Sequence, residues 1–321
     1  MNPAAVDLRV RLGRLELEHP LVDASGTFDL VETARRSRGD YVAAFPYAAY
    51  VPKTVTLDAR EGGPPPRVTE TPCGMINAIG LENPGVAAFL EGLSTIVGLR
   101  RPVIVSVGGN ATQEYADVVR RVETALGEGA RRFPDVAGYE LNVSCPNVPG
   151  GLAIGVDPQL TAEVTRAARA ATGRLLLVKL TPNVTDVRPV ARAAVEAGAD
   201  GLSLVNTFRA MVLDRSSLRP FLGNSTGGLS GPAIKPIALR MVAEVAEALP
   251  GVPLVGMGGI MTGVDALEFI ACGATAVAVG MANFTGLEAP RRILDGLRAE
   301  CAARGFARVT DARGVALARG A

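Results

Sequence analysis

LLLVKLTPNVTDVRPVARAAVEAGADGLSLVN, residues 175–206, contains one complete strand, helix and second strand. An apolar run over 175–180 predicts a buried strand, and a second such run covers 202–205. Between them apolar residues recur at helical spacing over 186–197, and Gly198 stands where that helix should end. The recurring residues are Val187, Val190, Ala191, Ala194 and Val195. A unit of this kind is typical of an α/β fold with a parallel sheet.

The same alternation runs along the whole chain of 321 residues. After a predicted N-terminal β-hairpin over 8–17, turning near Gly13, we expect eight strands that are apolar on both faces. They cover 21–24, 48–54, 103–107, 139–143, 175–180, 202–205, 254–257 and 276–279. This pattern predicts a closed (β/α)8 TIM barrel, with a doubly wound open sheet as the alternative. We find no linker or internal repeat, so 1–321 is expected to form a single domain.

Composition narrows the function classes. The 33 basic and 32 acidic residues nearly cancel, so no basic field favours nucleic acid or an anionic membrane. Asp7, Arg9 and Arg11 interrupt the N-terminal residues, which argues against a signal peptide. The apolar stretch 269–287 is broken near Gly273 and favours a helix end and a buried strand over a membrane span. A cytoplasmic protein is expected.

Cysteine and histidine usage restricts the chemistry further. The four cysteines, Cys73, Cys145, Cys272 and Cys301, lack the spacing of a zinc or iron–sulfur site, and no metal is expected. The single histidine, His19, is read as a polar turn residue before Pro20. We interpret Cys272 as a helix-end thiol and Cys301 as a packing thiol.

Polar residues and glycines follow every predicted strand. In a barrel these ends meet at one face, where active sites form. Two of the three lysines lie there, although the chain has thirty arginines (33 − 3). The strand ends read Ser25-Gly26, Lys53-Thr54, Gly108-Gly109-Asn110, Asn142 to Cys145, Lys179, Asn206-Thr207, Gly258-Gly259 and Gly280-Met281.

Three further features concern ligand binding. The glycines after the seventh and eighth predicted strands favour a phosphorylated cofactor or substrate, held by backbone N–H groups. Two connections, 57–83 and 208–232, are long enough to be lids or binding loops. From the residues alone, Cys145 in NVSCPN (142–147) remains open between a structural thiol and a base, since a nucleophile would lack a histidine partner. Lys235, at a predicted helix start, is open between function and surface.

The motifs together resemble the class 1 dihydroorotate dehydrogenases, over about 21–284. The matching stretches are ASG (24–26), PKT (52–54), PPPRVTETPCGMINAIGLENPG (64–85), NVSCPN (142–147), VKLTPN (178–183), NT (206–207), TGGLSGPAIKP (226–236) and GMGGI (256–260). PPPR (64–67), NAIGL (77–81) and GGLA (150–153) are most similar to subtype B.

The resemblance implies FMN-dependent oxidation of dihydroorotate to orotate in pyrimidine biosynthesis, with Cys145 as the base. Lys179 is implied to stabilise charge on the reduced flavin and Lys53 to contact both flavin and substrate. The implied FMN residues are Ser25, Lys53, Thr54, Asn110, Asn142, Lys179, Val205, Gly231, Gly258, Gly259, Gly280 and Met281. The implied substrate residues are Lys53, Asn77, Ala78, Ile79, Gly80, Leu81, Asn142, Asn206 and Thr207. Met281 departs from the family's usual threonine.

The resemblance leaves the electron acceptor open. Subtype B implies a homodimer core in a heterotetramer with an FAD/2Fe-2S subunit that reduces NAD. Subtype A implies a homodimer that uses fumarate. Because this chain lacks both a GxGxxG fingerprint and the cysteines for a cluster, such groups must come from a partner. Other hypotheses are a dihydropyrimidine dehydrogenase-type flavoprotein, a Schiff-base aldolase acting through Lys179, and a non-catalytic flavin-binding protein.

Overall fold

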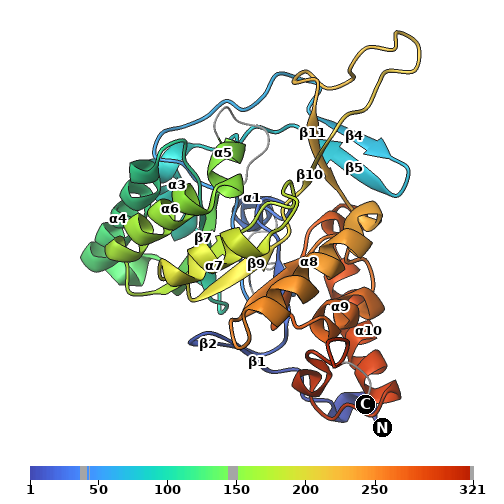
Figure 1. Cartoon of the computed structure of the whole chain (residues 1–321). Helices are drawn as coiled ribbons and strands as arrows, with labels where there is room; N and C mark the ends of the chain where they lie inside the picture. Colours follow the sequence, from blue (N-terminus) through green and yellow to red (C-terminus); the bar gives the residue numbers. More distant parts are fainter. Residues whose placement is uncertain (37–41, 43, 144–150, 319–321) are drawn as a thin grey trace.

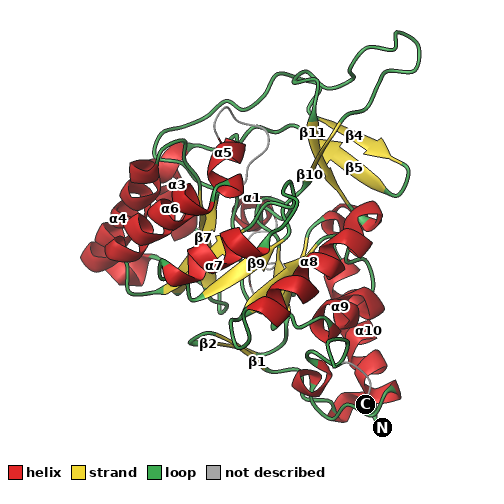
Figure 2. Ribbon diagram, in the orientation of Figure 1, coloured by secondary structure: helices red, strands yellow, loops and turns green. Residues whose placement is uncertain are grey.

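The computed structural model describes residues 1–36, 42, 44–143 and 151–318. A curled sheet of seven parallel strands forms its centre, and helices cover the outside (Figure 1, Figure 2). In sheet order the strands are β3 (Leu21–Asp23), β13 (Ala276–Val279), β12 (Leu254–Met257), β9 (Gly201–Leu204), β8 (Leu175–Lys179), β7 (Val136–Asn142) and β6 (Val103–Val107). Seven of the eight predicted strands are therefore confirmed, with ends that shift by at most a few residues.

The remaining predicted strand, 48–54, which is the second along the chain, closes the sheet into a barrel. On one side the Ala48 N–H donates to the Leu21 carbonyl at 2.9 Å. On the other side the Tyr50 carbonyl accepts from the Ile104 N–H at 2.9 Å. This segment forms isolated bridges instead of a regular strand, and Pro52, which has no N–H, interrupts its ladder. Because both edges are joined, the closed barrel is confirmed and the open sheet is wrong.

The helices pack their apolar faces onto the barrel. In α7 (Arg188–Glu196), for example, Val190, Ala191 and Ala194 are buried, as the sequence period predicts. Thr262 and Asp265 form a capping box at the start of α9 (Gly263–Ala271). The helices are α1 (Leu30–Arg36), α3 (Gly85–Ser94), α4 (Thr112–Gly129), α5 (Gly151–Val156), α6 (Pro158–Ala171), α7 (Arg188–Glu196), α8 (Lys235–Ala248), α9 (Gly263–Ala271) and α10 (Ala289–Ala303).

The two long connections form a second, antiparallel sheet above one end of the barrel (Figure 1). Its strand order is β10 (Phe208–Ala210), β11 (Gly227–Ser230), β5 (Gly74–Asn77) and β4 (Val68–Thr71). The long loops predicted for this face thus contain paired strands, which the sequence analysis missed. Pairing of β11 with β5 fixes each connection against the other.

The N-terminal hairpin is confirmed as β1 (Val10–Leu12) and β2 (Leu15–Leu17), with Gly13 at φ +61° in the turn. Short 3-10 helices complete the fold: η1 (Pro3–Ala5), η2 (Ala130–Arg132), η3 (Pro232–Ile234), η4 (Met281–Thr285) and η5 (Val309–Ala312). Among the described residues, no helix combines the length and the apolar character needed to span a membrane.

Candidate active site

Thr54 joins three strand ends at the barrel mouth. Its Oγ1 lies 3.3 Å from the Ser25 Oγ and 2.9 Å from the Ser106 Oγ, and it accepts from the Asn142 Nδ2 at 3.1 Å. Ser25 also donates to the Pro52 carbonyl at 2.8 Å. Because Thr54 and Asn142 are both buried, these bonds hold two residues predicted to bind FMN in one orientation.

The hydrogen-bonded chain continues toward the predicted substrate residues. The Asn206 Nδ2 donates to the Asn142 Oδ1 at 3.1 Å, and the Asn206 Oδ1 accepts from the Thr207 N–H at 2.9 Å. Tyr115 on α4 supports the chain from behind, since its hydroxyl lies 3.1 Å from the Asn142 carbonyl and 3.2 Å from the Gly109 carbonyl. We call Ser25, Thr54, Asn142 and Asn206 the mouth network.

The second sheet brings the remaining substrate residues over the mouth. Asn77 on β5 is paired with Gly228 on β11, and a side chain at Gly228 would collide with Thr207. Leu81, at φ +58°, is buried, and its Cδ1 lies 3.4 Å from where a Cβ on Gly108 would stand. The sheet therefore holds the predicted substrate loop, comprising Asn77, Ala78, Ile79, Gly80 and Leu81, against strand ends of the barrel.

Lys53 is half-buried and lies over Gly26, the glycine that follows Ser25. A Cβ on Gly26 would come within 2.7 Å of the Lys53 Cδ, and Gly26 has φ +78°. Any side chain larger than glycine would displace the lysine. This contact places Lys53 beside the mouth network.

Gly231, Gly258, Gly259 and Met281, all predicted to bind FMN, have neighbouring positions. A Cβ on Gly259 would stand 2.7 Å from the Gly231 carbonyl, and a Cβ on Gly231 would collide with the Met281 Sδ. Gly258, Gly259 and Gly231 all have positive φ, at +128°, +80° and +100°. These positions leave backbone surface where side chains would otherwise stand, which suits a phosphate held by N–H groups. Met281 contributes a thioether to this glycine-lined region.

The other predicted FMN residues have separate surroundings. Asn110 is exposed, and its N–H donates to the Glu114 Oε2 at 2.8 Å. Val205 is buried and its N–H donates to the Met257 carbonyl at 3.0 Å. Gly280 follows β13, and its carbonyl accepts from the Asn283 N–H at 3.0 Å. Each of them stands at a strand end of the same barrel face.

Lys179, at the end of β8, belongs to a buried polar cluster. Its Nζ lies 3.6 Å from the Glu140 Oε1, and both side chains are almost fully buried. Asp23 is fully buried, and burial raises the pKa of its carboxyl well above the ordinary value. Asp23, Glu140 and Tyr115 were not predicted from the sequence. The only signal for Asp23 and Glu140 in the sequence is an acidic residue within an otherwise apolar strand, as in LVD (21–23) and YELN (139–142).

The four cysteines and Lys235 remain to be placed. Cys145 lies outside the described residues. Cys272 ends α9 half-buried and Cys301 is buried in α10, as expected, and burial raises the pKa of both thiols. Cys73 is exposed, in the turn between β4 and β5. Lys235 contacts two carboxylates of α9, the Glu268 Oε2 at 2.7 Å and Asp265, and these ion pairs join the start of α8 to α9.

Two results concern His19 and metals. His19 lies in the bend before Pro20, as expected; its side chain is buried, and its Nδ1 accepts from the Leu21 N–H at 3.3 Å. Within the described part of the chain, no three histidine, cysteine, aspartate or glutamate side chains group as metal ligands do.

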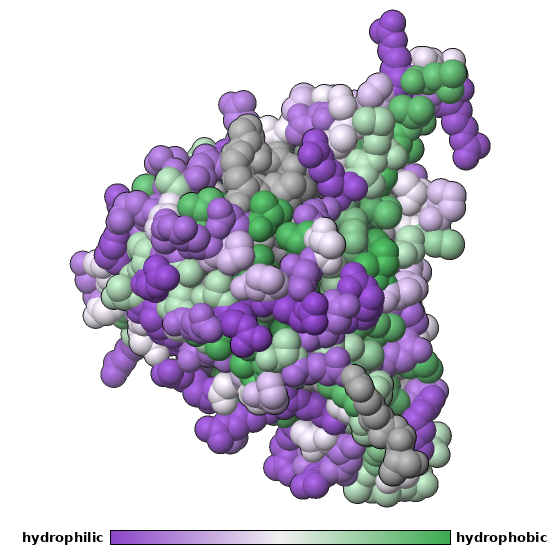
Figure 3. All heavy atoms as spheres, in the orientation of Figure 1, coloured by the Kyte–Doolittle hydropathy of each residue, from purple (hydrophilic) through white to green (hydrophobic). Residues whose placement is uncertain are grey.

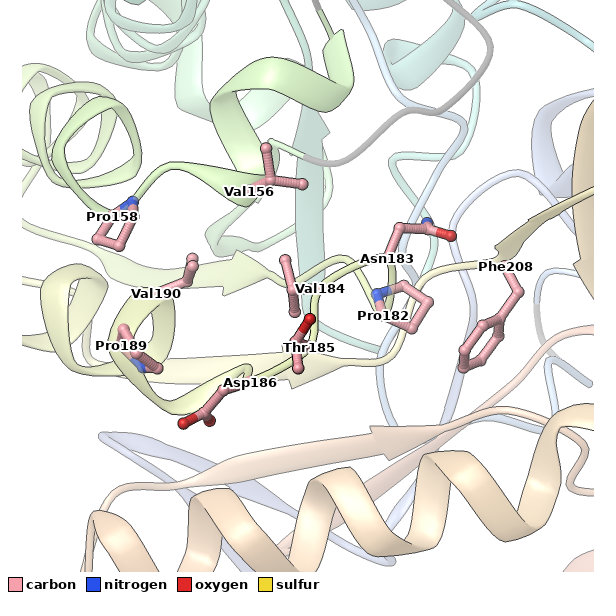
Figure 4. Close-up of a pocket in the computed structure, with 10 residues that line it drawn as sticks. All are labelled: Val156, Pro158, Pro182, Asn183, Val184, Thr185, Asp186, Pro189, Val190 and Phe208. Atoms are coloured by element: carbon pink, nitrogen blue, oxygen red, sulfur yellow. The ribbon is translucent and has the colours of Figure 1, made fainter.

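A surface pocket of about 670 Å³ flanks the mouth (Figure 4). Val156 at the end of α5, the loop from Pro182 to Asp186 and Phe208 on β10 line it. Asn183, which faces the pocket, donates from Nδ2 to the Thr207 carbonyl at 3.1 Å. The pocket contains none of the predicted FMN residues, so we place the active site at the mouth network and not here.

Comparisons with known proteins give the family. Residues 7–301 match the family model of dihydroorotate dehydrogenase. The catalytic subunit of dihydroorotate dehydrogenase B (NAD(+)) from Pelobacter propionicus is 47% identical over 307 residues, which are 95% of this chain and 97% of the relative. The same subunit from Desulforudis audaxviator is 49% identical over 280 residues, 87% of each chain.

A solved structure agrees with these relatives. The crystal structure of dihydroorotate dehydrogenase from Eimeria tenella, in complex with ferulenol, superposes with a TM-score of 0.80. It is 25% identical and covers 98% of this chain and 89% of that chain. The resemblance drawn from the motifs, including the likeness to subtype B, is confirmed, and the chain belongs to the dihydroorotate dehydrogenase family.

Proposed function

We propose that this chain is the catalytic subunit of a B-type dihydroorotate dehydrogenase. It would oxidise (S)-dihydroorotate to orotate in de novo pyrimidine biosynthesis and pass the electrons to NAD through a partner. The observation that carries the proposal is the mouth network, in which residues from four separate segments are hydrogen bonded side chain to side chain. Amides and hydroxyls fixed in this way supply the donors and acceptors that a pyrimidinedione edge requires.

FMN is the cofactor that the donor set fits. Gly231, Gly258 and Gly259 leave a backbone cradle for its phosphate, and the mouth network with Lys53 and Lys179 supplies donors for its ring. When bound, FMN would accept a hydride from C6 of the substrate. Lys179 would stabilise the resulting negative charge. Ser25, Thr54 and Asn142 would orient the ring.

On the substrate side, Lys53 would bind the carboxylate, and Asn77, Asn142, Asn206 and Thr207 would bind the ring. The second sheet supports this role, since it holds the segment from Asn77 to Leu81 against strand ends of the barrel. Cys145 would remove the proton from C5. A thiol, with an ordinary pKa near ~8.5, serves as a base near neutral pH when its surroundings favour the thiolate.

The partner is a separate part of the proposal. We expect a homodimer core joined to an FAD/2Fe-2S subunit, all in the cytoplasm, with 1–321 as one domain. The relatives are named catalytic subunits, which favours a partner over the fumarate-using alternative. Apolar side chains gather over the long connection between β10 and β11 (Figure 3). Met211, Leu213, Leu218 and Phe221 are exposed there, and such patches suit a protein contact.

The test uses the purified chain alone. We expect a yellow protein whose flavin is reduced anaerobically by dihydroorotate and is not reoxidised by fumarate. Reoxidation by NAD should require addition of the FAD/2Fe-2S subunit. Fumarate turnover by the isolated chain would contradict the B-type assignment, and reduction by dihydrouracil in preference to dihydroorotate would favour a dihydropyrimidine dehydrogenase-type enzyme.

A further inference from the structure

Five polar side chains lie inside the barrel, below the mouth network. They are Asp23 on β3, Ser106 on β6, Glu140 on β7, Lys179 on β8 and Ser203 on β9. All are buried: Asp23, Ser106 and Ser203 are 0% exposed, Glu140 3% and Lys179 6%. We call them the barrel cluster. Three ionisable groups in such a place are costly unless they are paired.

The strand register shows that Glu140 points inward. Its neighbour Tyr139 donates from its hydroxyl to the Glu123 Oε1 at 2.9 Å, on α4 outside the barrel. Successive side chains of a strand point to opposite faces, so Glu140 faces the interior. In the sheet Ser106 is paired with Glu140, and Ser203 with Lys179.

The contacts within the cluster are incomplete. Lys179 Nζ and Glu140 Oε1 lie 3.6 Å apart, which is close enough for an ion pair but long for a hydrogen bond. Among the described residues, three buried oxygens of the cluster have no hydrogen-bond partner: Glu140 Oε1, Asp23 Oδ2 and Ser203 Oγ. Asp23 Oδ1, in contrast, accepts from the Val51 N–H at 2.6 Å.

Charge balance distinguishes the two carboxyl groups. If Asp23, Glu140 and Lys179 were all ionised, the barrel interior would carry a net negative charge in apolar surroundings. Glu140 has a cation within 3.6 Å. Asp23 is fully buried with one oxygen unpartnered, and its pKa is raised by burial first and by Glu140 among the charged groups. Glu140 is therefore the carboxylate in contact with the Lys179 cation, and Asp23 is the carboxyl group whose burial favours the neutral form.

We propose that Glu140 is the counter-ion of Lys179 and, as a positioning residue, sets how strongly this lysine stabilises reduced flavin, while Asp23 remains a neutral carboxylic acid. This inference rests on the proposed function, in which Lys179 lies beside the flavin ring. The negative charge of Glu140 compensates part of the positive charge of Lys179, so Lys179 stabilises the reduced flavin less than an unpaired lysine would. The pair therefore keeps the flavin midpoint potential lower than Lys179 alone would.

The experiment compares the midpoint potential of bound FMN in matched variants, with dithionite as reductant so that substrate turnover is not needed. Glu140→Gln keeps the shape and removes the charge. We expect it to favour reduced over oxidised flavin by about tenfold, which is a rise of about 30 mV for two electrons. Glu140→Asp keeps the charge and should restore most of the wild-type potential. Lys179→Ala should shift the potential in the opposite direction, downward.

Asp23→Asn tests the second half of the proposal independently. If Asp23 is neutral, this near-isosteric change removes no charge and leaves the potential at the wild-type value. An upward shift like that of Glu140→Gln would overturn the neutral assignment. Ser203→Ala, which changes no charge, is the control for disturbance of packing and should leave the potential unchanged.

The outcomes separate this inference from the proposed function. Wild-type protein that fails to bind flavin, or whose flavin dihydroorotate does not reduce, contradicts the proposed function. Wild-type protein that passes both tests while Glu140→Gln leaves the potential unchanged or lowers it overturns the counter-ion role. If Glu140→Gln does not retain flavin, Asp23→Asn carries the test, because an upward shift of its potential would overturn the assignment of Asp23 and Glu140.

Discussion

The side chains of Asn142 and Asn206 are hydrogen bonded to each other, with the Asn206 Nδ2 donating to the Asn142 Oδ1 at 3.1 Å. Asn142 in turn donates to Thr54. The Oδ1 and the Nδ2 of Asn142 therefore each have a hydrogen-bond partner. Rotation of the side-chain amide of either asparagine would break the mouth network.

Asn206→Asp replaces the donor that faces the Asn142 Oδ1 with an acceptor. The two oxygens then repel each other, and the Asn142 amide loses its fixed orientation. We expect kcat/KM for dihydroorotate to fall by about tenfold to a hundredfold, equivalent to about 1.4–3 kcal/mol. Steady-state kinetics check this, with Asn224→Asp, at an exposed position, as the control. Equal losses in both variants would contradict a specific role for Asn206.

Thr54→Val removes the hydroxyl that joins Ser25, Ser106 and Asn142 while keeping the side-chain shape. Three polar groups lose a buried partner, so we expect weaker FMN retention and a loss of stability of about 1–3 kcal/mol. Equilibrium dialysis and urea unfolding measure the two effects. The matched control is Thr165→Val, because Thr165 is buried and, among the described residues, its hydroxyl bonds only to the Thr161 carbonyl within α6. It should lose stability without losing FMN.

Met281→Thr introduces the residue that the family usually carries. In this chain the Met281 sulfur lies against Gly231 in the glycine-lined region. A shorter side chain with a hydroxyl offers the phosphate an added donor. We expect tighter FMN binding, seen as a lower Kd in a fluorescence titration. An unchanged Kd would show that backbone N–H groups alone hold the phosphate.

Cys145→Ser tests the proposed base. The variant should keep FMN and orotate binding, yet its flavin should be reduced far more slowly near neutral pH, because a hydroxyl is a much weaker acid than a thiol. Anaerobic stopped-flow reduction by dihydroorotate measures this rate. A rate equal to that of the wild type would remove Cys145 from the chemistry.

His19 predicts a pH dependence of stability. Burial first, and then Arg101 and Arg298, lower its pKa to about 4, against an ordinary value near ~6.5. Between these values the unfolded chain binds a proton that the folded chain does not, so this residue's contribution makes stability fall as the pH falls from 6.5 toward 4. The loss is on the order of 3 kcal/mol.

His19→Asn provides the comparison, because the asparagine Oδ1 can still accept from the Leu21 N–H. Urea unfolding at pH 7 and pH 5 should show a smaller difference for the variant than for the wild type. The Glu18 Oε1 lies 3.6 Å from the His19 Nε2, and Glu18 is half exposed. Glu18 should therefore have little effect on the pH dependence of stability that His19 contributes. An equal pH difference in both proteins would show that His19 does not carry the effect.

The sequence predicted the barrel well because its strands carry a local signal. Runs such as 175–180 are apolar on both faces, and the helix after them repeats with a period that only a helix satisfies. Strand 48–54 was placed correctly although it forms only bridges, since its residues are still buried on both sides.

The second sheet and the barrel cluster were not predictable in the same way. β11 contains Gly227 and Gly228, and glycine has no side chain that could show the apolar–polar alternation of a strand. β11 is therefore recognised as a strand only by its pairing with β5. The sequence shows that Glu140 and Asp23 are acidic residues within or beside predicted strands. Whether they face the core depends on the curvature of the barrel and on Lys179, which lies on another strand.

Anaerobic titration of the purified, FMN-loaded chain with (S)-dihydroorotate tests the central claim most directly. The account predicts that the visible absorbance of oxidised flavin disappears and that one orotate forms for each flavin reduced. A flavin that stays oxidised in the presence of excess dihydroorotate, in protein that dithionite still reduces, would contradict it.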